Sequence, residues 1–166
     1  MEVPFIPIKP LTIEAFAPFG EVIDLDKADH FPINNGMCTR YNDLATVELG
    51  GVEPRPLVNI FRGKPYDIPL HLKMVERHPL GSQAFIPMSK RPFLVIVAPD
   101  EAGTPGKPEA FLTQSGQGIN LKMGCWHGVL TTLEQTSDFV VIDRGGPGEN
   151  LEEFYYEPGF LVGFAD

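Results

Sequence analysis

Short stretches of alternating apolar and polar residues, or of continuous apolar residues, follow one another along most of this chain. Stretches of roughly four to eight residues that end near a Gly or Pro are typical of β-strands. The pattern predicts about ten strands and an all-β fold. The predicted strands are Glu21–Leu25, Ala45–Leu49, Leu57–Phe61, Leu70–His78, Gln83–Met88, Phe93–Ala98, Ala110–Thr113, Gly118–Met123, Gly128–Leu133 and Asp138–Asp143.

One helical segment stands out from this pattern. Thr12 precedes Ile-Glu-Ala-Phe and can cap a short helix that ends by Pro18 and Gly20. No helical pattern separates the strands, so the crossovers that join parallel strands have no place. We therefore predict a single domain over residues 1–166, a jelly-roll or β-barrel of antiparallel strands with one or two short helices. More than about 35% of residues should lie in strands and fewer than about 15% in helices.

The C-terminal segment, Asn150–Leu161, mixes acidic residues with aromatic ones. Such a segment can cover a sheet of its own chain or pack on a second subunit. We expect it to cover its own sheet, because this is the more common use of aromatic side chains.

The composition of the chain limits the kinds of partner and the cell compartment that can be expected. The chain has 166 residues, 17 Gly and 17 Pro, and a formal net charge of -9 without a basic cluster, which argues against nucleic-acid binding. Cys38 and Cys125 are too few for a disulfide framework. The longest aliphatic run, Phe93–Ala98, is far shorter than the roughly 20 residues that span a bilayer, and the N-terminus lacks the pattern of a signal peptide. We expect a cytoplasmic protein with no membrane segment and no nucleotide cofactor.

Candidate chemistry begins with polar residues at the end of an apolar strand. Residues two apart share a strand face, so Leu72 and Met74 should point the same way as Glu76 and His78. A turn at Pro79–Ser82 would then return the chain on the adjacent strand, which carries Gln83. A second polar group, Cys-Trp-His, follows Gly124 and ends at His127.

These residues resemble the motifs of the cupin superfamily. Its first motif has the form His-x-His, three or four residues and an acid, and its second begins with Gly and ends in His. Here Glu76 and Gln83 replace the first His and the acid, His78 is retained, and Gly118 leads to His127. The resemblance implies a cupin-like β-barrel in which Glu76, His78, Gln83 and His127 would be the ligands of any bound divalent metal.

A narrower resemblance rests on several strings in one order. ERHPLGSQAFIPM, FLVIVA, HFPINNG, Cys-Trp-His and VVIDRGG together resemble the ureidoglycolate lyase family, from about residue 11 to residue 146. The resemblance implies a homodimer that converts (S)-ureidoglycolate to glyoxylate and urea in allantoin and purine breakdown, with Ni²⁺ as the cofactor.

This substrate sets chemical requirements. Cleavage removes the proton of a hydroxyl group while a carbon–nitrogen bond breaks, so a base and an acid are needed. His127 or Glu76 can take the proton, with His78 as a third candidate catalytic residue. A metal bound by the substrate carboxylate and hydroxyl would lower the pKa of that hydroxyl.

Other side chains could bind the substrate. Its carboxylate calls for a cation, and the sequence leaves Arg62, Arg77, Lys122 and Arg144 as candidates. Asn34 and Asn35 belong to a turn signal, Asn-Asn-Gly, that makes residues 30–40 a loop or hairpin. Their amides could reach a ureido group if this loop folds over the mouth of the barrel.

Blander interpretations apply to several residues. Cys125 invites interpretation as a nucleophile paired with His127, but a buried thiol is more common. Trp126 is expected in the core or a pocket wall, and His71 is expected in solvent on the opposite face from Glu76. The alternative to an enzyme is a non-catalytic cupin-type domain that binds a small metabolite or has a regulatory role, since one barrel hosts many functions.

Overall fold

The computed structural model describes residues 2–166 and is built almost entirely of β-strands. Strands take 52% of the residues and helices 4%, with a closed β-barrel of six strands, which confirms the predicted all-β barrel. The elements are β1 Phe5–Pro10, α1 Ile13–Phe16, β2 Gly20–Ile23, β3 His30–Ile33, η1 Asn34–Gly36, β4 Cys38–Tyr41, β5 Arg55–Gly63, β6 Leu70–Arg77, β7 Gln83–Pro87, β8 Phe93–Ala98, β9 Asp100–Glu101, β10 Thr104–Pro105, β11 Glu109–Leu112, β12 Gly118–Leu121, β13 Trp126–His127, β14 Thr131–Thr132, β15 Ser137–Gly145 and β16 Glu152–Gly163.

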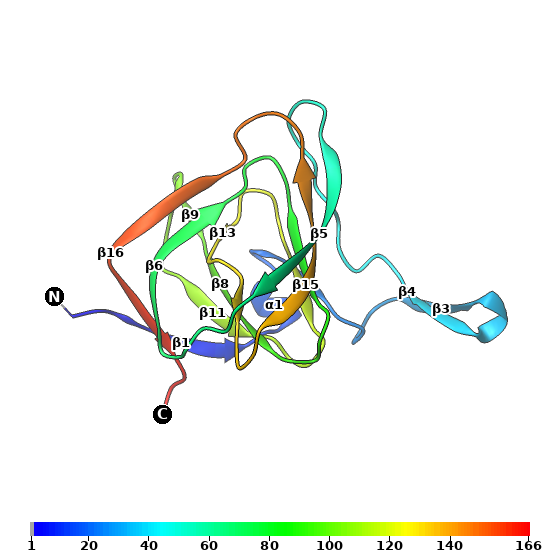
Figure 1. The fold of residues 1–166 in the computed structure, drawn as a ribbon, viewed down its shortest axis with the longest axis horizontal. Helices are drawn as coiled ribbons and strands as arrows, with labels where there is room; N and C mark the ends of the chain where they lie inside the picture. Colours follow the sequence, from blue (N-terminus) through cyan, green and yellow to red (C-terminus); the bar gives the residue numbers. More distant parts are fainter. Residues whose placement is uncertain (1) are drawn as a thin grey trace.

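Two sheets make up the body of the molecule (Figure 1). In the first, β11, β1, β16, β6, β13 and β8 pair in that order, and pairing between β8 and β11 closes the ring. The second sheet has five strands in the order β2, β12, β7, β15 and β5. Consecutive strands β6 and β7 therefore lie in different sheets, and the turn between them carries the chain from the barrel to the second sheet.

Strand β1 corrects the prediction of antiparallel pairing throughout. It runs parallel to β11 and to β16, while the other ladders between named strands of residues 2–166 are antiparallel. The absence of crossover helices excludes only parallel strands that are close in sequence. Here the partners of β1 lie about a hundred residues or more away, so the intervening chain provides the connection.

The N-terminal helix forms where its cap was predicted. The side chain of Thr12 accepts a hydrogen bond from the backbone N–H of Ala15 at 3.1 Å, which satisfies one of the free donors at the helix start. Phe16, the last helical residue, is fully buried. The helix thereby adds an aromatic side chain to the core between the two sheets.

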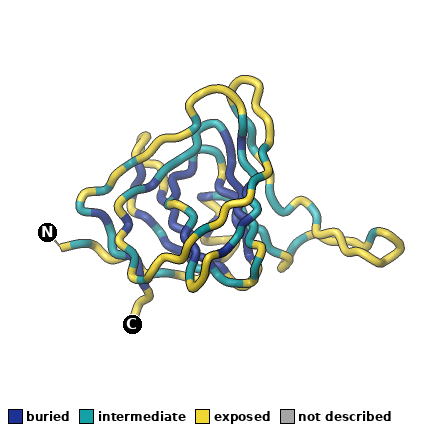
Figure 2. Tube along the Cα trace, viewed as in Figure 1, coloured by how far each residue is buried: buried dark blue, intermediate teal, exposed yellow. Residues whose placement is uncertain are grey.

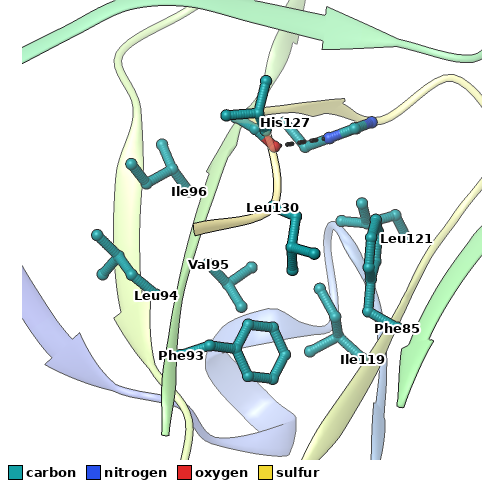
Figure 3. Close-up of a pocket in the computed structure, with 11 residues that line it drawn as sticks. Phe85, Phe93, Leu94, Val95, Ile96, Ile119, Leu121, His127 and Leu130 are labelled. Atoms are coloured by element: carbon teal, nitrogen blue, oxygen red, sulfur yellow. Dashed lines mark hydrogen bonds between the residues drawn. The ribbon is translucent and has the colours of Figure 1, made fainter. Parts of the chain in front are cut away.

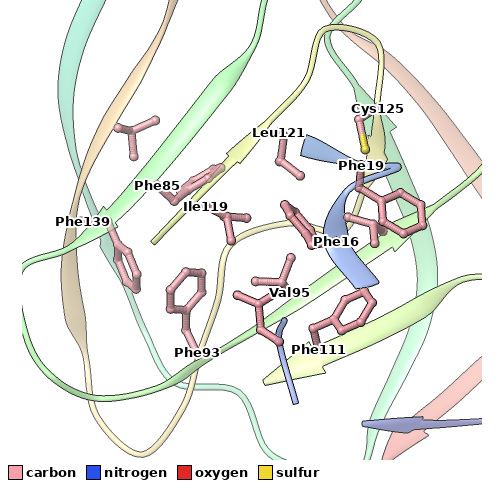
Figure 4. Packing of buried hydrophobic residues seen from close by; sticks show 13 residues of the cluster. Phe16, Phe19, Phe85, Phe93, Val95, Phe111, Ile119, Leu121, Cys125 and Phe139 are labelled. Atoms are coloured by element: carbon pink, nitrogen blue, oxygen red, sulfur yellow. The ribbon is translucent and has the colours of Figure 1, made fainter. Parts of the chain in front are cut away.

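Strand β8 is buried on both faces and joins two apolar clusters. Phe93 and its alternate neighbours pack with α1 and the second sheet, as Figure 4 shows, whereas Leu94 and its alternate neighbours pack with residues of the barrel strands. Each fully buried large apolar side chain, such as Phe111 or Phe139, stabilises the fold by about 1.5–3 kcal/mol. The long apolar run in the sequence is therefore the wall shared by both cores.

Several predicted strands have different limits. Ala45–Leu49 is not a strand, and only an isolated bridge from Leu49 to Gly81 forms there. The predicted strand Gly128–Leu133 is reduced to the two residues of β14. Residues 2–166 contain sixteen strands rather than about ten, because β1, β3, β4 and β16 were not among the predicted strands and because β9, β10 and β13 are strands of two residues. The aromatic C-terminal segment is itself a barrel strand, β16, paired with β6 and β1.

The hairpin of β3, η1 and β4 projects away from the barrel (Figure 1), and most of its residues are exposed (Figure 2). Asn34 and Asn35 have positive φ angles of 53° and 56°, which is the conformation expected of these turn residues. The turn prediction is confirmed, but the hairpin does not fold over the barrel of its own chain. Within residues 2–166, no helix is long and apolar enough to cross a membrane.

Candidate active site

Pairing between β13 and β6 places two of the predicted site residues side by side. His127 lies directly opposite Glu76 in the antiparallel ladder, and His78 follows at the end of β6. The ring centroids of His78 and His127 are 5.1 Å apart. The two rings are therefore close enough to bind one metal ion, since ligands of one metal must lie within a few ångströms of each other.

The alternation expected along β6 does not hold over the whole strand. Leu72 and Val75 pack in the same apolar cluster, although strict alternation would place them on opposite faces. The pairing register between β6 and β16 shifts between Tyr155 and Phe160, and such bulges increase local twist. Glu76 and His78 nevertheless reach the same site, because both follow this irregularity.

Gln83 joins the site from the opposite sheet. The sequence predicted that it would return on the strand adjacent to β6, but β7 pairs with β12 and β15 instead. Its side chain is buried, and its Oε1 lies 3.1 Å from Nε2 of His78. The site therefore lies between the barrel wall and the second sheet.

Three side chains of this site form a group that could hold a metal ion. One potential ligand atom from each of Glu76, His78 and His127 lies within 4.8 Å of the others. Glu76 Oε1 is 4.0 Å from His78 Nε2, and both side chains are about 80% covered. Within residues 2–166, no other such group of His, Cys, Asp or Glu occurs.

His127 presents a free nitrogen to the site. Its Nδ1 is 2.9 Å from the carbonyl oxygen of Gly128, so Nδ1 carries the proton and Nε2 has a lone pair (Figure 3). Nε2 is buried and has no hydrogen-bond partner in the described structure. Burial lowers the pKa of His127 to about 4 because the charged form loses its hydration. His127 is therefore a neutral donor atom at neutral pH and a weak base.

The pKa of Glu76 is shifted in the opposite direction. Partial burial is the main cause that raises the pKa of its carboxyl group, and the nearby Glu153 raises it further. His78 acts against both and lowers it. A carboxylate with a raised pKa is a better proton acceptor than an ordinary one, so Glu76 is the stronger candidate for the base.

A hydrogen-bonded chain behind His78 was not predicted from the sequence. Gln83 Nε2 donates to Asp143 Oδ2 at 3.3 Å, and Asn59 Nδ2 donates to the other oxygen of Asp143 at 3.0 Å. On the other side, His78 Nδ1 donates to the carbonyl oxygen of Asn150 at 2.9 Å. The string VVIDRGG contains Asp143, but its neighbours on β5 and β7 become visible only in the folded sheet.

The donor set fits a divalent cation. In a neutral His78 ring that donates through Nδ1, the lone pair of Nε2 faces the lone pairs of Gln83 Oε1 at 3.1 Å, whereas a protonated ring would donate to this oxygen. A divalent cation bound by both atoms would remove this mismatch, because both lone pairs would then face a positive charge. Together with the unpartnered Nε2 of His127, these atoms form a mixed nitrogen and oxygen site. Glu76, His78, Gln83 and His127 are thus suited to hold such an ion.

A cavity of about 630 Å³ opens onto this group. Glu76, Gln83 and His127 form its polar wall, and Phe61, Phe85 and Leu130 form apolar wall. A much smaller pocket of about 20 Å³ lies among apolar side chains beneath His127 (Figure 3). The large cavity has room for a small polar molecule, whereas the small one has room for little more than a water molecule.

The cationic side chains that were predicted to bind the substrate carboxylate lie in different parts of the structure. Arg62 lines the cavity, but its guanidinium binds Asp138 at 2.8 and 3.0 Å. Lys122 and Arg77 lie along a different pocket. Arg77 is paired with Asp100 and Glu152.

Arg144 also serves another purpose. It is buried and donates to the carbonyl oxygens of Gly50 and Pro147, at 2.7 and 2.9 Å, which fixes two loops. Lys64 and Tyr66, which no sequence motif indicates, line the large cavity instead. Lys64 makes no ion pair within residues 2–166, so it is the cation of the cavity wall that remains available to a ligand.

The remaining candidate residues do not line the large cavity. Cys125 is buried, and burial raises the pKa of its thiol to about 12, which disfavours a nucleophilic thiolate. Trp126 is buried and donates from Nε1 to Asp100 at 2.9 Å. His71 is exposed, as predicted, beside the carbonyl oxygen of Pro158. Asn34 and Asn35 lie at the tip of the projecting hairpin, so they do not line the cavity of their own chain.

Comparisons with known proteins agree over almost the whole chain. A family model described as ureidoglycolate lyase matches residues 3–163. The chain is 61% identical over 160 residues to ureidoglycolate lyase 2 of Rhizobium meliloti, covering 96% of this chain and 98% of that protein. It is 59% identical to the ureidoglycolate lyase of Chelativorans sp., covering 93% of each chain, and 56% identical to that of Mesorhizobium japonicum, covering 95% and 96%. The chain therefore belongs to the ureidoglycolate lyase family.

Proposed function

We propose that this chain cleaves (S)-ureidoglycolate to glyoxylate and urea, as a step of allantoin and purine breakdown in the cytoplasm. The observation that carries the proposal is the group of Glu76, His78, Gln83 and His127 at the wall of the large cavity. Its neutral donor atoms and one proton-accepting carboxylate match what the reaction needs. The names of the similar proteins support the same activity.

Glu76 is the proposed proton carrier. The substrate carbon bears a hydroxyl group, a carboxylate and a ureido nitrogen. Glu76 takes the hydroxyl proton, the carbon–oxygen bond becomes a carbonyl as the carbon–nitrogen bond breaks, and the same proton passes to the departing nitrogen. The products are glyoxylate and urea, with no net gain or loss of protons. The opposite pKa shifts of Glu76 and His127 favour the carboxylate for this role.

The uncharged nitrogen and oxygen atoms of the site are the proposed ligands of a metal ion. His127 Nε2, His78 Nε2 and Gln83 Oε1 would bind a divalent cation together with one carboxylate oxygen of Glu76, which leaves the other oxygen of Glu76 for the proton. Ni²⁺ is the ion we propose from the family resemblance. When bound, such an ion lowers the pKa of a hydroxyl group that coordinates it. The buried imidazole of His127 stays neutral at pH 7, so it does not repel a cation.

Lys64 is the proposed partner of the substrate carboxylate. It lines the same cavity as Glu76 and has no ion pair within the described chain, whereas Arg62 beside it is held by Asp138. An ammonium group at this wall would bind the carboxylate and leave the hydroxyl and ureido groups directed at Glu76. Phe61 and Leu130 provide apolar surface in the same cavity.

We also propose that the chain forms a homodimer, in which the β3–β4 hairpin makes the contact. A two-stranded hairpin is marginally stable alone in water, yet this one exposes Phe31, Tyr41 and Met37, the last 88% exposed. Light scattering should give twice the chain mass of 18.3 kDa, and the Phe31→Asp and Met37→Asp double variant should shift toward the monomer. A wild-type mass near 18.3 kDa at micromolar concentration would contradict the dimer.

A colour assay for glyoxylate tests the proposed activity. Purified protein is incubated with racemic ureidoglycolate, and spontaneous decay of the substrate is subtracted with a protein-free sample. We expect glyoxylate release to stop near half conversion, because one enantiomer is the substrate. Release no faster than decay, under both metal-free and Ni²⁺-loaded conditions, would favour the non-catalytic binding domain instead.

A further inference from the structure

The amide of Gln83 has one orientation because of the residue behind it. An ionised carboxylate only accepts hydrogen bonds, so Asp143 requires the NH₂ group of Gln83 to face it, at 3.3 Å. The carbonyl oxygen must then point the other way, toward His78 at 3.1 Å. The orientation of one buried amide thus depends on a carboxylate that does not line the cavity.

Asp143 is itself held in place. Asn59 donates its Nδ2 to Oδ1 of Asp143 at 3.0 Å, which leaves Oδ2 for Gln83. Both residues lie on paired strands of the second sheet, where Asn59 is opposite Val141 and Asp143 is opposite Leu57. The rigid ladder between β5 and β15 therefore fixes the carboxylate that orients the amide.

The contact between His78 Nε2 and Gln83 Oε1 shows what the fixed orientation of the Gln83 amide provides. His78 Nδ1 faces the carbonyl oxygen of Asn150 and donates to it, so in the neutral ring the Nε2 lone pair points at the lone pairs of Gln83 Oε1, whereas the protonated ring would donate to this oxygen. A flipped amide would offer His78 an N–H donor and would satisfy this contact. The sequence uses Asp143 to prevent that flip, which gives the site an oxygen donor instead of an N–H group.

We propose that Asp143, supported by Asn59, is a positioning residue that turns the Gln83 carbonyl oxygen into a ligand for a divalent cation. This inference rests on the cation site of the proposed function, but it does not depend on the identity of the substrate. Residues that orient metal ligands from behind commonly change metal affinity by about 10–100-fold when they are replaced.

The substitution Asp143→Asn tests the proposal without removing a hydrogen bond. The new amide can accept from Asn59 and donate to Gln83 Oε1, and the flipped Gln83 amide can then donate to His78 Nε2. The hydrogen bonds that join Asn59, residue 143, Gln83 and His78 are thus satisfied in the variant, so we expect its metal-free form to be as stable as the wild type. The same flip removes the oxygen donor from the site.

Isothermal titration calorimetry with Ni²⁺ on metal-free protein provides the readout. We expect Asp143→Asn to weaken Ni²⁺ binding about 10–100-fold. Adding Gln83→Glu to this variant should restore binding to within a few-fold of the Gln83→Glu single variant, because a carboxylate has an oxygen on either side and cannot present an N–H group. The matched control is Asp138→Asn, on the same strand but paired with Arg62 at the surface, which should leave Ni²⁺ affinity unchanged.

Three results would overturn the proposal. The first is a wild-type protein that binds no Ni²⁺, the second is unchanged affinity in Asp143→Asn, and the third is a loss that Gln83→Glu does not restore. Loss of stability in metal-free Asp143→Asn together with unchanged Ni²⁺ affinity would assign Asp143 a purely structural role. The glyoxylate assay on the wild type decides the proposed function separately, so failure of one claim is distinguishable from failure of the other.

Discussion

Acidification should destabilise this protein through His127. The unfolded chain protonates this histidine below a pKa of about 6.5, whereas the folded chain does so only near pH 4. Between these values the unfolded state binds more protons, so the free energy of unfolding falls as the pH falls. A difference of about 2.5 pKa units corresponds to about 3 kcal/mol at roughly 1.4 kcal/mol per unit. This contribution is fully present above pH 6.5 and is lost by about pH 4.

The control is His127→Asn, which keeps an N–H group near the position of Nδ1 and has no titrating group. Urea unfolding of both proteins, followed by fluorescence of the single Trp126 in the presence of a chelator, gives the free energy of unfolding from pH 7 to pH 4. The exposed histidines, His30 and His71, are the same in both proteins and lie away from the site, so their effects cancel in the difference.

We expect the wild type to lose about 3 kcal/mol more than the variant over this range, with the change concentrated between about pH 6.5 and pH 4. Parallel pH profiles for the two proteins would refute the reasoning. They would mean that His127 is solvated or charged in the folded state, and the argument for a neutral donor atom would fail.

Three further predictions concern activity. Glu76→Gln should lower kcat by about 10²–10⁴-fold at unchanged fold, measured by glyoxylate release, whereas His71→Ala, which alters an exposed histidine outside the cavity, should leave kcat unchanged. Lys64→Met should raise KM with little change in kcat, and Lys64→Arg should restore most of the affinity; a normal KM in Lys64→Met would exclude the carboxylate contact. Exhaustive chelation should lower activity and added Ni²⁺ should restore it, while activity untouched by chelation would show that the four side chains act without an ion.

The pattern of the sequence was enough to predict the class of fold and most strands. Continuous apolar residues in Phe93–Ala98 reflect burial on both faces, and Thr12 marked the one α-helix in the described chain. The parallel pairing of β1 could not be predicted, because a strand pattern fixes which side chains share a face but not which distant strand is the neighbour. Ala45–Leu49 has a strand-like composition but finds only a single bridge partner.

The sequence predicted those residues of the candidate site that lie in motifs, but not those that join the site through strand pairing. Glu76 and His127 have side chains that can bind a metal, and both lie in recognisable motifs. They could therefore be named before the pairing of their strands was known. Gln83 was named as well, but the sheet that carries it was not, since a four-residue turn looks the same whether it joins neighbours or crosses between sheets. No local signal assigns Asp143 or Lys64 to the site, although Asp143 lies in the string VVIDRGG. Their importance comes from cross-strand neighbours and from a cavity wall, which exist only after folding.

The most direct test of the central claim is the set of products formed from (S)-ureidoglycolate. Urea, glyoxylate and ammonia are measured in one reaction, after spontaneous decay is subtracted. Transfer of the hydroxyl proton to the ureido nitrogen by Glu76 breaks only the carbon–nitrogen bond at the substrate's central carbon. We therefore expect equal amounts of urea and glyoxylate and no ammonia. Ammonia released in place of urea would show that water attacks the urea carbonyl, and it would contradict the proposed role of Glu76.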